Sequence, residues 1–408
     1  MVSALVLGAA GAVGRTCWQF LSHINIFDKL FLGDKRVEEL RKLVEISRAY
    51  NVEVIPVDAD DKSSLTRAIE KTDVVLNAVG PFFVYGPKIL DAALEVGVDY
   101  VDVCDDFDAT VKMLERHEEA VARGVKALIG MGSSPGLSNI IVKFAAQRLF
   151  EEVESVDIAH VHGGERYEGP AVIMHRAHSM MIDIPVYING DIVYTSLESD
   201  FARQFEQEFD FPNLGKFPVY LYPHPETYTL PKYFRIAKRV TNLGVVLPPQ
   251  FPALIRALVR IGLFSDEEVE VSGVRLRARD FAVAYVLKKR GELLEKYGPI
   301  EPVGSLVIVI EGRHSGRRCK LTFYTTAHGL GMGDATGIPL GLGGIMMVKG
   351  MIQSPGVHPP EAVIDPVELF KLAKEFVATK LGKGIPVNVI EECNGVRREY
   401  NIETLFSR

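Results

Sequence analysis

The first 150 residues alternate short, continuous apolar runs with longer segments in which apolar side chains recur at helical spacing. Regular alternation of this kind predicts an α/β fold with a parallel, doubly wound sheet. The runs are apolar throughout and do not alternate with polar residues, which is typical of strands covered on both faces. We expect six strands, each followed by a helix, at residues 4–7, 30–32, 52–57, 74–76, 100–103 and 127–129.

The pattern changes after about residue 150, where the apolar runs become longer and alternate with polar positions. The runs 303–311 and 321–327 flank a turn that contains two glycines, which predicts an antiparallel hairpin. Residues 329–350 predict a glycine-rich turn and a helix with a small-residue face, and residues 366–380 predict an amphipathic helix. The second part of the chain is therefore expected to be an α+β domain.

Two late stretches, 245–264 and 337–352, are apolar enough to be considered for membrane contact. Prolines and arginines interrupt the first stretch, and the second is glycine-rich and shorter than a membrane span. We interpret both as core or subunit-interface segments and expect no membrane span.

The composition of the 408 residues is typical of a globular protein, with 47% hydrophobic and 24% charged residues, which excludes a disordered or collagen-like chain. The formal net charge is -7 and no basic stripe is visible, so we expect no nucleic-acid partner. The four cysteines, Cys17, Cys104, Cys319 and Cys393, form no C-x-x-C pair. Their spacing argues against a zinc site and a disulfide framework and favours a reducing compartment, so we expect a cytoplasmic protein.

A glycine-rich turn, Gly8-Ala9-Ala10-Gly11-Ala12-Val13-Gly14, lies between the first expected strand and the first helix. Its glycines allow a tight turn, close approach of a pyrophosphate to the backbone, and close packing of the helix on the strand. The free N–H groups at the start of the helix then face the phosphates. Because a strand precedes the motif and an acid follows about twenty residues later, the sequence predicts a dinucleotide-binding site.

That acid is Asp34, at the end of the second expected strand. A carboxylate at this place accepts hydrogen bonds from the ribose hydroxyls and repels a 2′-phosphate. Lys35 and Arg36 follow directly and could hold that phosphate, or could mark a solvated helix start. We therefore expect NAD as the cofactor, with NADP possible.

Ligands of open α/β sheets bind beyond the carboxyl ends of the strands, which selects the loops after the later strands as further candidates. Asp58 follows the third strand near the expected adenine, and residues 77–81 follow the fourth near the ribose or nicotinamide. Residues 104–106 follow the fifth strand, and residues 132–136 follow the sixth. The cofactor residues that we expect are Gly8, Ala10, Gly11, Ala12, Val13, Gly14, Asp34, Lys35, Arg36, Asp58, Asn77, Ala78, Val79, Gly80 and Pro81.

Several of these motifs together resemble the saccharopine dehydrogenase-like family, which includes saccharopine reductase, lysine 6-dehydrogenase and carboxynorspermidine dehydrogenase. The resemblance is carried by the glycine loop, Asp34, Asn77–Pro81, Tyr100-Val101-Asp102 and Gly132–Gly136. It extends into the later part of the chain, at residues 224–226, 229–231, 337–339 and 355–357.

The resemblance implies a Rossmann domain, a second domain that forms the substrate cleft and a homodimer, and a C-terminal helix that returns to the first domain. On this basis we place the three parts at residues 1–135, 136–335 and 336–408. It also implies hydride transfer between nicotinamide and a carbon–nitrogen bond of an amino acid.

The chain departs from the family pattern in two loops. Saccharopine reductases carry an Asp before Pro-Gly in the loop after the sixth strand, where this chain has Ser134, and the loss of that carboxylate argues against saccharopine as the substrate. Cys104-Asp105-Asp106 is also unusual and supplies acids that could bind the substrate ammonium group. Gly80-Pro81-Phe82 with Tyr85-Gly86 is similar to the trans-acting enoyl reductase branch.

Oxidation of an amine needs a base with a pKa near the working pH, such as a histidine or a desolvated carboxylate. Asp105 and Asp106 are candidates, because a second carboxylate nearby raises the pKa of the first. Either residue could instead cap the following helix. Cys104 could line the substrate site or could be a core cysteine.

Two residues are candidates for holding a substrate carboxylate. Ser134 fits the N-cap of the next helix, with Pro135 in its first turn, and the amides of Gly136 and Leu137 could then bind the carboxylate. Arg176 has a planar fork that matches two carboxylate oxygens, although it could also be a surface arginine.

Histidines are concentrated in the second part of the chain. No carboxylate or cysteine lies at a familiar metal-ligand spacing from these histidines, so we expect no metal site. His175 and His224 are considered as bases, and structural or surface roles are the alternative. The histidines weighed in this way are His160, His162, His175, His178 and His224.

The leading hypothesis is an NAD(P)-dependent oxidoreductase that acts on an amino acid or an opine-like secondary amine. A second hypothesis is a cyclodeaminase, in which bound NAD oxidises and then re-reduces one molecule. The third is a reductase of a carrier-bound or lipid-like substrate, or a non-catalytic, redox-sensing NAD(P)-binding protein. The apolar segment 245–264 motivates the third hypothesis.

Overall fold

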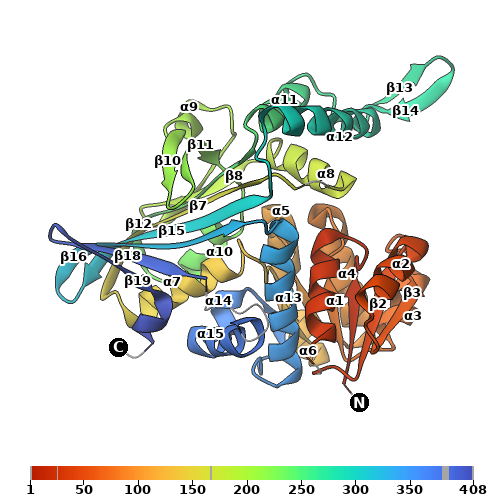
Figure 1. Cartoon of the computed structure of the whole chain (residues 1–408), viewed down its shortest axis with the longest axis horizontal. Helices are drawn as coiled ribbons and strands as arrows, with labels where there is room; N and C mark the ends of the chain where they lie inside the picture. Colours follow the sequence, from red (N-terminus) through yellow and green to blue (C-terminus); the bar gives the residue numbers. More distant parts are fainter. Residues whose placement is uncertain (1, 25, 166–167, 379–385, 407–408) are drawn as a thin grey trace.

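A parallel sheet of seven strands forms the core of the first part in the computed structural model, with helices on both faces (Figure 1). The structure describes residues 2–24, 26–165, 168–378 and 386–406. The strand order is β17-β6-β5-β4-β1-β2-β3, and the predicted doubly wound sheet is confirmed. The strands are β1 (Ser3–Leu7), β2 (Lys29–Asp34), β3 (Val52–Pro56), β4 (Val74–Asn77), β5 (Asp99–Asp102), β6 (Lys126–Leu128) and β17 (Gly356–His358).

The connecting helices differ from the prediction in two places. The helix expected over residues 87–96 begins at Phe82, because a proline near a helix start removes only one hydrogen bond. The helix expected over residues 109–123 is two helices that meet at Glu115 and Arg116. The helices are α1 (Ala12–Ser22), α2 (Val37–Ser47), α3 (Lys62–Ile69), α4 (Phe82–Val96), α5 (Phe107–Leu114), α6 (His117–Arg123) and α7 (Leu137–Arg148).

The second part is built on a mixed sheet of ten strands. Its main path is β10-β11-β12-β7-β15-β16-β18-β19; β8 pairs with β12, and β9 pairs with β8. The expected hairpin is β15 with β16, and it is longer than predicted. The strands are β7 (Glu152–Gly163), β8 (Ile184–Ile188), β9 (Asp191–Thr195), β10 (Gln207–Phe211), β11 (Gly215–Leu221), β12 (Ile236–Leu247), β15 (Val303–His314), β16 (Arg317–His328), β18 (Asn388–Cys393) and β19 (Val396–Asn401).

Five helices and a small hairpin accompany this sheet. The hairpin β13–β14 projects away from the rest of the molecule, at the end of α12 (Figure 1). The helix α8 lies between the sheet and the first part, where it reaches the loops after β4 and β5. These elements are α8 (Pro170–Ser179), α9 (Asp200–Arg203), α10 (Glu226–Tyr233), α11 (Gln250–Arg260), α12 (Ala278–Tyr297), β13 (Glu268–Val271) and β14 (Val274–Arg277).

The chain returns to the first part through α13 (Met332–Val348), which packs along α1. Its glycines allow the close approach: a Cβ at Gly337 would lie 2.5 Å from the carbonyl oxygen of Val13, and one at Gly341 would lie 2.8 Å from the Phe20 ring. The chain then adds β17 to the parallel sheet. It continues through α14 (Pro360–Val363), α15 (Pro366–Ala373) and a π-helical turn (Lys374–Ala378).

The prediction that residues 336–408 pack on the first part is wrong for residues 388–401. These residues form β18 and β19, which extend the second sheet beyond β16. The hairpin of β18 and β19 gains backbone hydrogen bonds by pairing with β16. The pattern of apolar residues in the sequence does not reveal such pairing. The end of the expected helix 366–380 lies partly outside the described residues.

The expectation that the cysteines form no disulfide is also wrong at one place. Cys319 of β16 and Cys393 of β18 are directly opposite in the register and form a disulfide. They are 74 residues apart in the sequence, so their pairing depends on the sheet and not on spacing. The pair removes the cysteine-based argument for a reducing compartment. Cys17 and Cys104 are free and buried.

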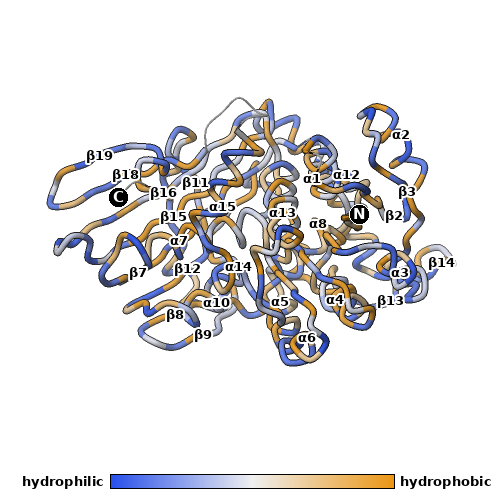
Figure 2. Tube along the Cα trace, turned by 90° about the horizontal axis from the view of Figure 1, so that it is seen from below, coloured by the Kyte–Doolittle hydropathy of each residue, from blue (hydrophilic) through white to orange (hydrophobic). Residues whose placement is uncertain are grey.

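Hydrophobic positions run through the middle of the molecule, including α13 (Figure 2). The apolar stretch 245–264 forms the end of β12 and the helix α11, whose Phe251 and Ile255 are buried. Within the described residues, no helix is both long and apolar enough to cross a membrane.

A buried carboxyl group lies where α7, α10 and α14 meet. Glu361 is 2% exposed, and its Oε2 accepts a hydrogen bond from Nδ2 of Asn139 at 2.9 Å. Burial raises the pKa of Glu361 to about 7. The folded state therefore holds this proton at pH values where the unfolded chain has released it.

The close packing of α13 on α1 predicts opposite effects for two glycine-to-alanine changes. Gly337→Ala places a methyl group against backbone and is expected to lower the free energy of unfolding by about 1–3 kcal/mol. Gly291→Ala, in α12, meets nothing within 4 Å and is expected to raise it by about 0.5–1 kcal/mol. Urea unfolding of both variants measures the difference. Equal effects of the two changes would contradict the packing argument.

Glu361 predicts a pH-dependent loss of stability. Its raised pKa means that its contribution is complete below the ordinary value of 4.5 and falls as pH rises to about 7. Glu361→Gln keeps the shape without the ionisation, so its gain over wild type is expected to grow over this range to at most about 3 kcal/mol. Urea unfolding at a series of pH values tests this. Glu38→Gln, at a side chain 79% exposed, is the control and is expected to show no such growth.

Candidate active site

The glycine loop forms a tight connection between β1 and α1. Gly8 has a φ of +74°, which only glycine adopts without strain, and a Cβ at Gly14 would lie 2.3 Å from the Gly8 carbonyl oxygen. Gly11 is the N-cap residue of α1 and offers no side-chain cap. The amides of the first turn, from Ala12 and Val13 onward, are thus left for a ligand.

Asp34 ends β2 and is held against this loop. Its Oδ2 accepts a hydrogen bond from the Ala10 N–H at 2.9 Å, and its Oδ1 accepts one from the Arg36 N–H at 2.9 Å. The Arg36 guanidinium lies 3.5 Å from the same Oδ1. Lys35 and Asp58 are exposed nearby, at the ends of β2 and β3. The structure therefore brings the expected adenosine-binding residues to one edge of the sheet.

Asn77–Pro81 follow β4 and lie directly beside the glycine loop. A Cβ at Gly8 would be only 2.7 Å from the carbonyl oxygen of Ala78. Asn77 shapes this turn, because its Oδ1 accepts from the Val79 N–H at 2.9 Å and its Nδ2 donates to the Tyr100 hydroxyl at 2.9 Å. The segment Ala78, Val79, Gly80 and Pro81 then leads from the cofactor edge toward the second part.

A buried residue under this edge was identified only as part of the family resemblance. Asp102 ends β5, and its Oδ1 accepts hydrogen bonds from the Cys104 and Gly130 N–H groups at 3.0 Å and 2.7 Å. Its Oδ2 accepts from the Tyr100 hydroxyl at 2.9 Å. Burial raises the pKa of Asp102 to about 6. The carboxylate fixes the loops after β5 and β6, which carry the next group of side chains.

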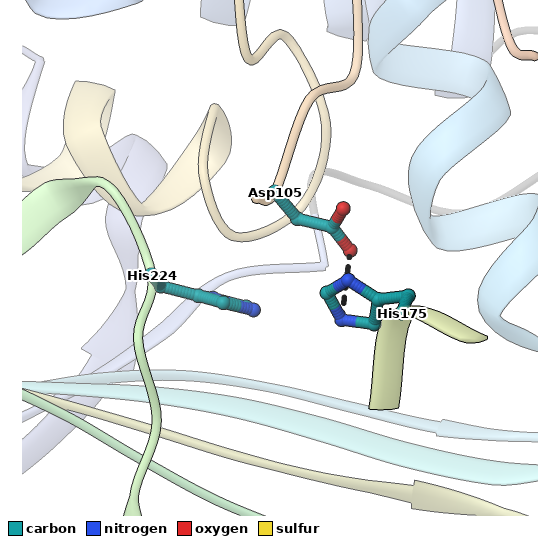
Figure 3. A group of neighbouring side chains, drawn as sticks. All are labelled: Asp105, His175 and His224. Atoms are coloured by element: carbon teal, nitrogen blue, oxygen red, sulfur yellow. Dashed lines mark ion pairs between the residues drawn. The ribbon is translucent and has the colours of Figure 1, made fainter. Parts of the chain in front are cut away.

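The four residues expected to be catalytic converge from three distant segments, and Figure 3 shows three of them, Asp105, His175 and His224. Asp105 and Asp106 follow β5, His175 lies on α8, and His224 lies just before α10. Nδ1 of His175 is 2.8 Å from Oδ1 of Asp106, and Nε2 of His175 is 3.5 Å from Oδ2 of Asp105. The ring of His224 points at this pair, and one atom from each of Asp105, His175 and His224 lies within 4.8 Å of the others.

Asp106 joins this group to the cofactor edge. It occupies the N-cap position of α5, but its side chain makes no capping hydrogen bond to that helix. Its Oδ2 instead accepts from the Phe83 N–H at 2.8 Å, and its Oδ1 faces His175. One carboxylate, 2% exposed, thus connects the start of α4 with α8.

Burial and the neighbouring charges decide the protonation states of Asp105, His175 and His224. Burial lowers the pKa of His175, but Asp105 and Asp106 outweigh it and hold that pKa well above the ordinary value. Burial raises the pKa of Asp105 to about 6, against the opposing charge of His175. Burial and the neighbouring His160 lower the pKa of His224 well below its ordinary value. At neutral pH, His175 is charged and His224 is neutral.

The other histidines surround this centre. His160 stacks on His224, with ring centroids 5.0 Å apart, and burial lowers its pKa to about 3. His162 lies 3.7 Å from a carboxylate oxygen of Glu165. His178 lies one turn after His175 on the same side of α8, and its Nε2 is 3.0 Å from Asp108. Because His175 pairs with two carboxylates and lies beside His224, the arrangement is suited to proton transfer.

Ser134 does not cap the following helix, contrary to one of the two expectations. The helix α7 begins at Leu137, with Gly136 as the N-cap residue. The Gly136 and Leu137 N–H groups are bound to Asn139 Oδ1 and to the Gly132 carbonyl, so they are not free for a substrate carboxylate. The hydroxyl of Ser134 instead donates to Glu226 at 2.5 Å.

Cys104 and Arg176 were expected to contact the substrate. In the structure, each of these two side chains contacts other groups of the protein instead. Cys104 is fully buried, with its thiol beside the Asp106 carbonyl oxygen and the Thr110 hydroxyl. Arg176 forms two hydrogen bonds to Glu168, at 2.7 and 2.6 Å. Arg290 binds the same carboxylate at 2.7 Å. The fork of Arg176 is therefore already occupied.

Sequence reasoning missed the oxygen atoms that line the back of this centre. Oε2 of Glu165, Oε2 of Glu226 and Oδ1 of Asn242 are buried and have no hydrogen-bond partner within the described part of the chain. Asn242 lies in β12, and an amide directly before the apolar run 243–247 was the available signal. Buried polar atoms without a partner are rare in folded proteins and point to a bound group or water.

Two family models match this chain. The saccharopine dehydrogenase NADP binding domain matches residues 4–128. The saccharopine dehydrogenase C-terminal domain matches residues 173–378. Together they cover the glycine loop, the Asp105–Asp106 loop and the segments that carry His175 and His224.

Relatives of known activity match over most of their length. A carboxyaminopropylagmatine dehydrogenase from Synechocystis is 23% identical over 392 residues, which are 92% of this chain and 96% of the relative. A carboxynorspermidine synthase from Vibrio cholerae is 24% identical over 396 residues, which are 87% of this chain and 91% of the relative.

A solved structure has the same fold. Saccharopine dehydrogenase (L-Glu forming) from Saccharomyces cerevisiae superimposes with a TM-score of 0.68 at 15% identity, covering 96% of this chain and all of the other. The two family models span more than half of the chain and include both parts of the candidate active site. The chain therefore belongs to the saccharopine dehydrogenase family of NAD(P)-dependent oxidoreductases.

Proposed function

We propose that this enzyme transfers a hydride between nicotinamide and a carbon–nitrogen bond of a carboxylated secondary amine that carries a polyamine-like arm. The observation that carries the proposal is the hydrogen bond from the Phe83 N–H to Asp106 at 2.8 Å. It joins the first turn of α4, which directly follows the loop where the nicotinamide is expected, to the carboxylates and histidines beside it. A hydride acceptor and a proton acceptor are then close together.

In the oxidative direction, a hydride leaves the substrate carbon for the nicotinamide, and the proton on nitrogen goes to a base. We assign the base to Asp105, because Asp106 is bound to both Phe83 and His175. Its pKa of about 6 leaves it ionised at neutral pH. The product is an imine, and addition of water then releases a carbonyl compound and an amine. The reductive direction reverses these steps.

The charges of the site support an amine-rich arm. Arg176 is bound by Glu168 and is not available for a second carboxylate of a substrate. The buried oxygens of Glu165 and Asn242 that have no partner within the described residues accept hydrogen bonds and are matched by ammonium or guanidinium groups. The relatives named for carboxylated polyamine derivatives agree with this chemistry. Saccharopine, with several carboxylates, is a poorer match.

We propose NAD as the preferred cofactor and NADP as a weaker one. Asp34 is held at the end of β2 by the Ala10 N–H, in the position where a carboxylate binds ribose hydroxyls and repels a 2′-phosphate. Arg36 lies 3.5 Å from Asp34 and partly offsets that repulsion. Homodimer formation and a cytoplasmic location stay predictions.

Turnover measured by nicotinamide absorbance tests the proposed reaction. The purified enzyme is given a panel of carboxynorspermidine, saccharopine and simple amino acids, each with NAD and with NADP. We expect turnover of the carboxylated polyamine to exceed that of saccharopine by at least about tenfold in kcat/KM, with NAD the better cofactor. Turnover of saccharopine alone, or of none of these compounds, would contradict the proposal.

The assignment of Asp105 predicts a pH dependence. Because the ionised carboxylate is needed, kcat/KM in the oxidative direction is expected to rise with pH and to level off above a pKa near 6. Asp105→Asn is expected to lower kcat by about 10²–10⁴-fold and to remove this dependence. Asp108→Asn is the matched control, because Asp108 follows the same strand and pairs with His178 of the same helix. A similar loss in both variants would assign Asp105 a structural role instead.

A further inference from the structure

A second carboxyl group lies behind the centre, in the first turn of α10. Glu226 is completely buried, and its Oε1 accepts two hydrogen bonds. One comes from the Ser134 hydroxyl at 2.5 Å and the other from the Ser138 hydroxyl at 2.8 Å. Burial raises the pKa of Glu226. The two serines hold the same oxygen but differ in what else they contact.

Only Ser134 connects this carboxyl group to the centre. Its Oγ is 3.4 Å from Nδ1 of His224, and Nδ2 of Asn242 donates to the same Oγ at 3.4 Å. Oε2 of Glu226 is 3.9 Å from Nδ1 of His224, which is too long for a direct hydrogen bond. The hydroxyl thus stands between the histidine and the carboxyl group.

His224 lies between the Asp105–His175 pair and this network. Its ring is 5% exposed, one side faces Ser134, and the ring points toward Asp105 and His175 (Figure 3). His160 stacks flat against it, with an interplanar angle of 9°. The stacking restricts rotation of the ring, so the two nitrogens keep their separate neighbours.

We propose that Glu226 is a positioning residue that acts on His224 through the hydroxyl of Ser134. The proposal rests on the proposed function, because the proton concerned is released when water adds to the imine. Nδ1–H of His224 donates to Ser134, and Ser134 donates to Glu226. This chain holds His224 in the tautomer whose Nε2 is free to accept a proton in the cleft.

The proton transfer balances without a further reactant. When water adds to the imine carbon, its proton goes to Nε2 of His224, the Nδ1 proton moves to Ser134, and the Ser134 proton moves to Glu226. When the carbon–nitrogen bond breaks, the same chain runs in reverse and His224 returns a proton to the leaving amine. No electrons are exchanged in either step, and Asp105 remains the base of the hydride-transfer step.

Ser134 and Ser138 form a matched pair for the test, because each donates to the same oxygen and only Ser134 contacts His224. Ser134→Ala is expected to lower kcat by at least about tenfold with KM within twofold, and Ser134→Thr is expected to restore it. Ser138→Ala is expected to keep kcat within about twofold, as a residue outside the proton path. Glu226→Gln, which still accepts from both serines but cannot take the proton, is expected to match Ser134→Ala. Thermal unfolding of each variant confirms that it is folded.

The kinetic result overturns the proposal if Ser138→Ala loses as much as Ser134→Ala, if Ser134→Ala keeps wild-type kcat, or if Glu226→Gln is fully active. The first of these outcomes would show that the network has only a structural role.

A second measurement separates this proposal from the proposed function. Nitrogen chemical shifts of ¹⁵N-histidine-labelled protein report which ring nitrogen of His224 carries the proton, with Asn in place of His224 identifying its signals. We expect His224 to be in the Nδ1–H tautomer in wild type and in Ser138→Ala. In Ser134→Ala we expect a mixture of the two tautomers of His224. This readout needs no substrate. Absence of turnover on the panel would therefore contradict the proposed function and leave the tautomer measurement as the test of the positioning role. An unchanged tautomer of His224 in Ser134→Ala would contradict the positioning role of Glu226 and Ser134.

Discussion

The carboxylate of Asp106 connects three segments that are distant in the sequence. It accepts a hydrogen bond from the Phe83 N–H, faces His175 of α8, and begins α5. Because it is buried, its charge has to be matched by these partners, and removing one of them would leave an uncompensated charge. The contact therefore fixes the distance between the loop expected to bind nicotinamide and the residues that handle protons. The position of the second sheet relative to the first follows from this contact and from the return of α13 onto α1.

Burial divides the histidines of the site into two kinds. His175 is charged, because two carboxylates outweigh its burial, and His224 and His160 are neutral, because little nearby offsets theirs. A charged and a neutral imidazole in one cleft can hold a carboxylate in place and accept a proton at the same pH. Sequence composition could not distinguish them, since the two residue types are the same and only their neighbours differ.

This chain brings a carboxyl group to the loop after β6 from a different element than the family pattern does. The loop after β6 carries Ser134 where saccharopine reductases are expected to have an Asp. In the structure, Ser134 is hydrogen-bonded to Glu226, which comes from α10. The Glu226 carboxyl group is therefore separated from His224 by the Ser134 hydroxyl, which contacts both. This arrangement leaves the cleft with neutral and negative groups beside one charged histidine.

The sequence by itself determined the parallel sheet, the glycine loop and the positions of six of the seven strands, because these depend on local periodicity and on glycine at fixed offsets. It also identified Asp105, Asp106, His175 and His224 as candidates from their residue types. Only the tertiary structure decided that the four lie together, that Arg176 is occupied by Glu168, and that Cys319 pairs with Cys393. The helix start after β6 was also decided there, because Gly136, with a φ of +119°, and not Ser134, forms the cap. Such contacts join residues from eight to more than a hundred positions apart, and their energies depend on burial and on partners that no local pattern records.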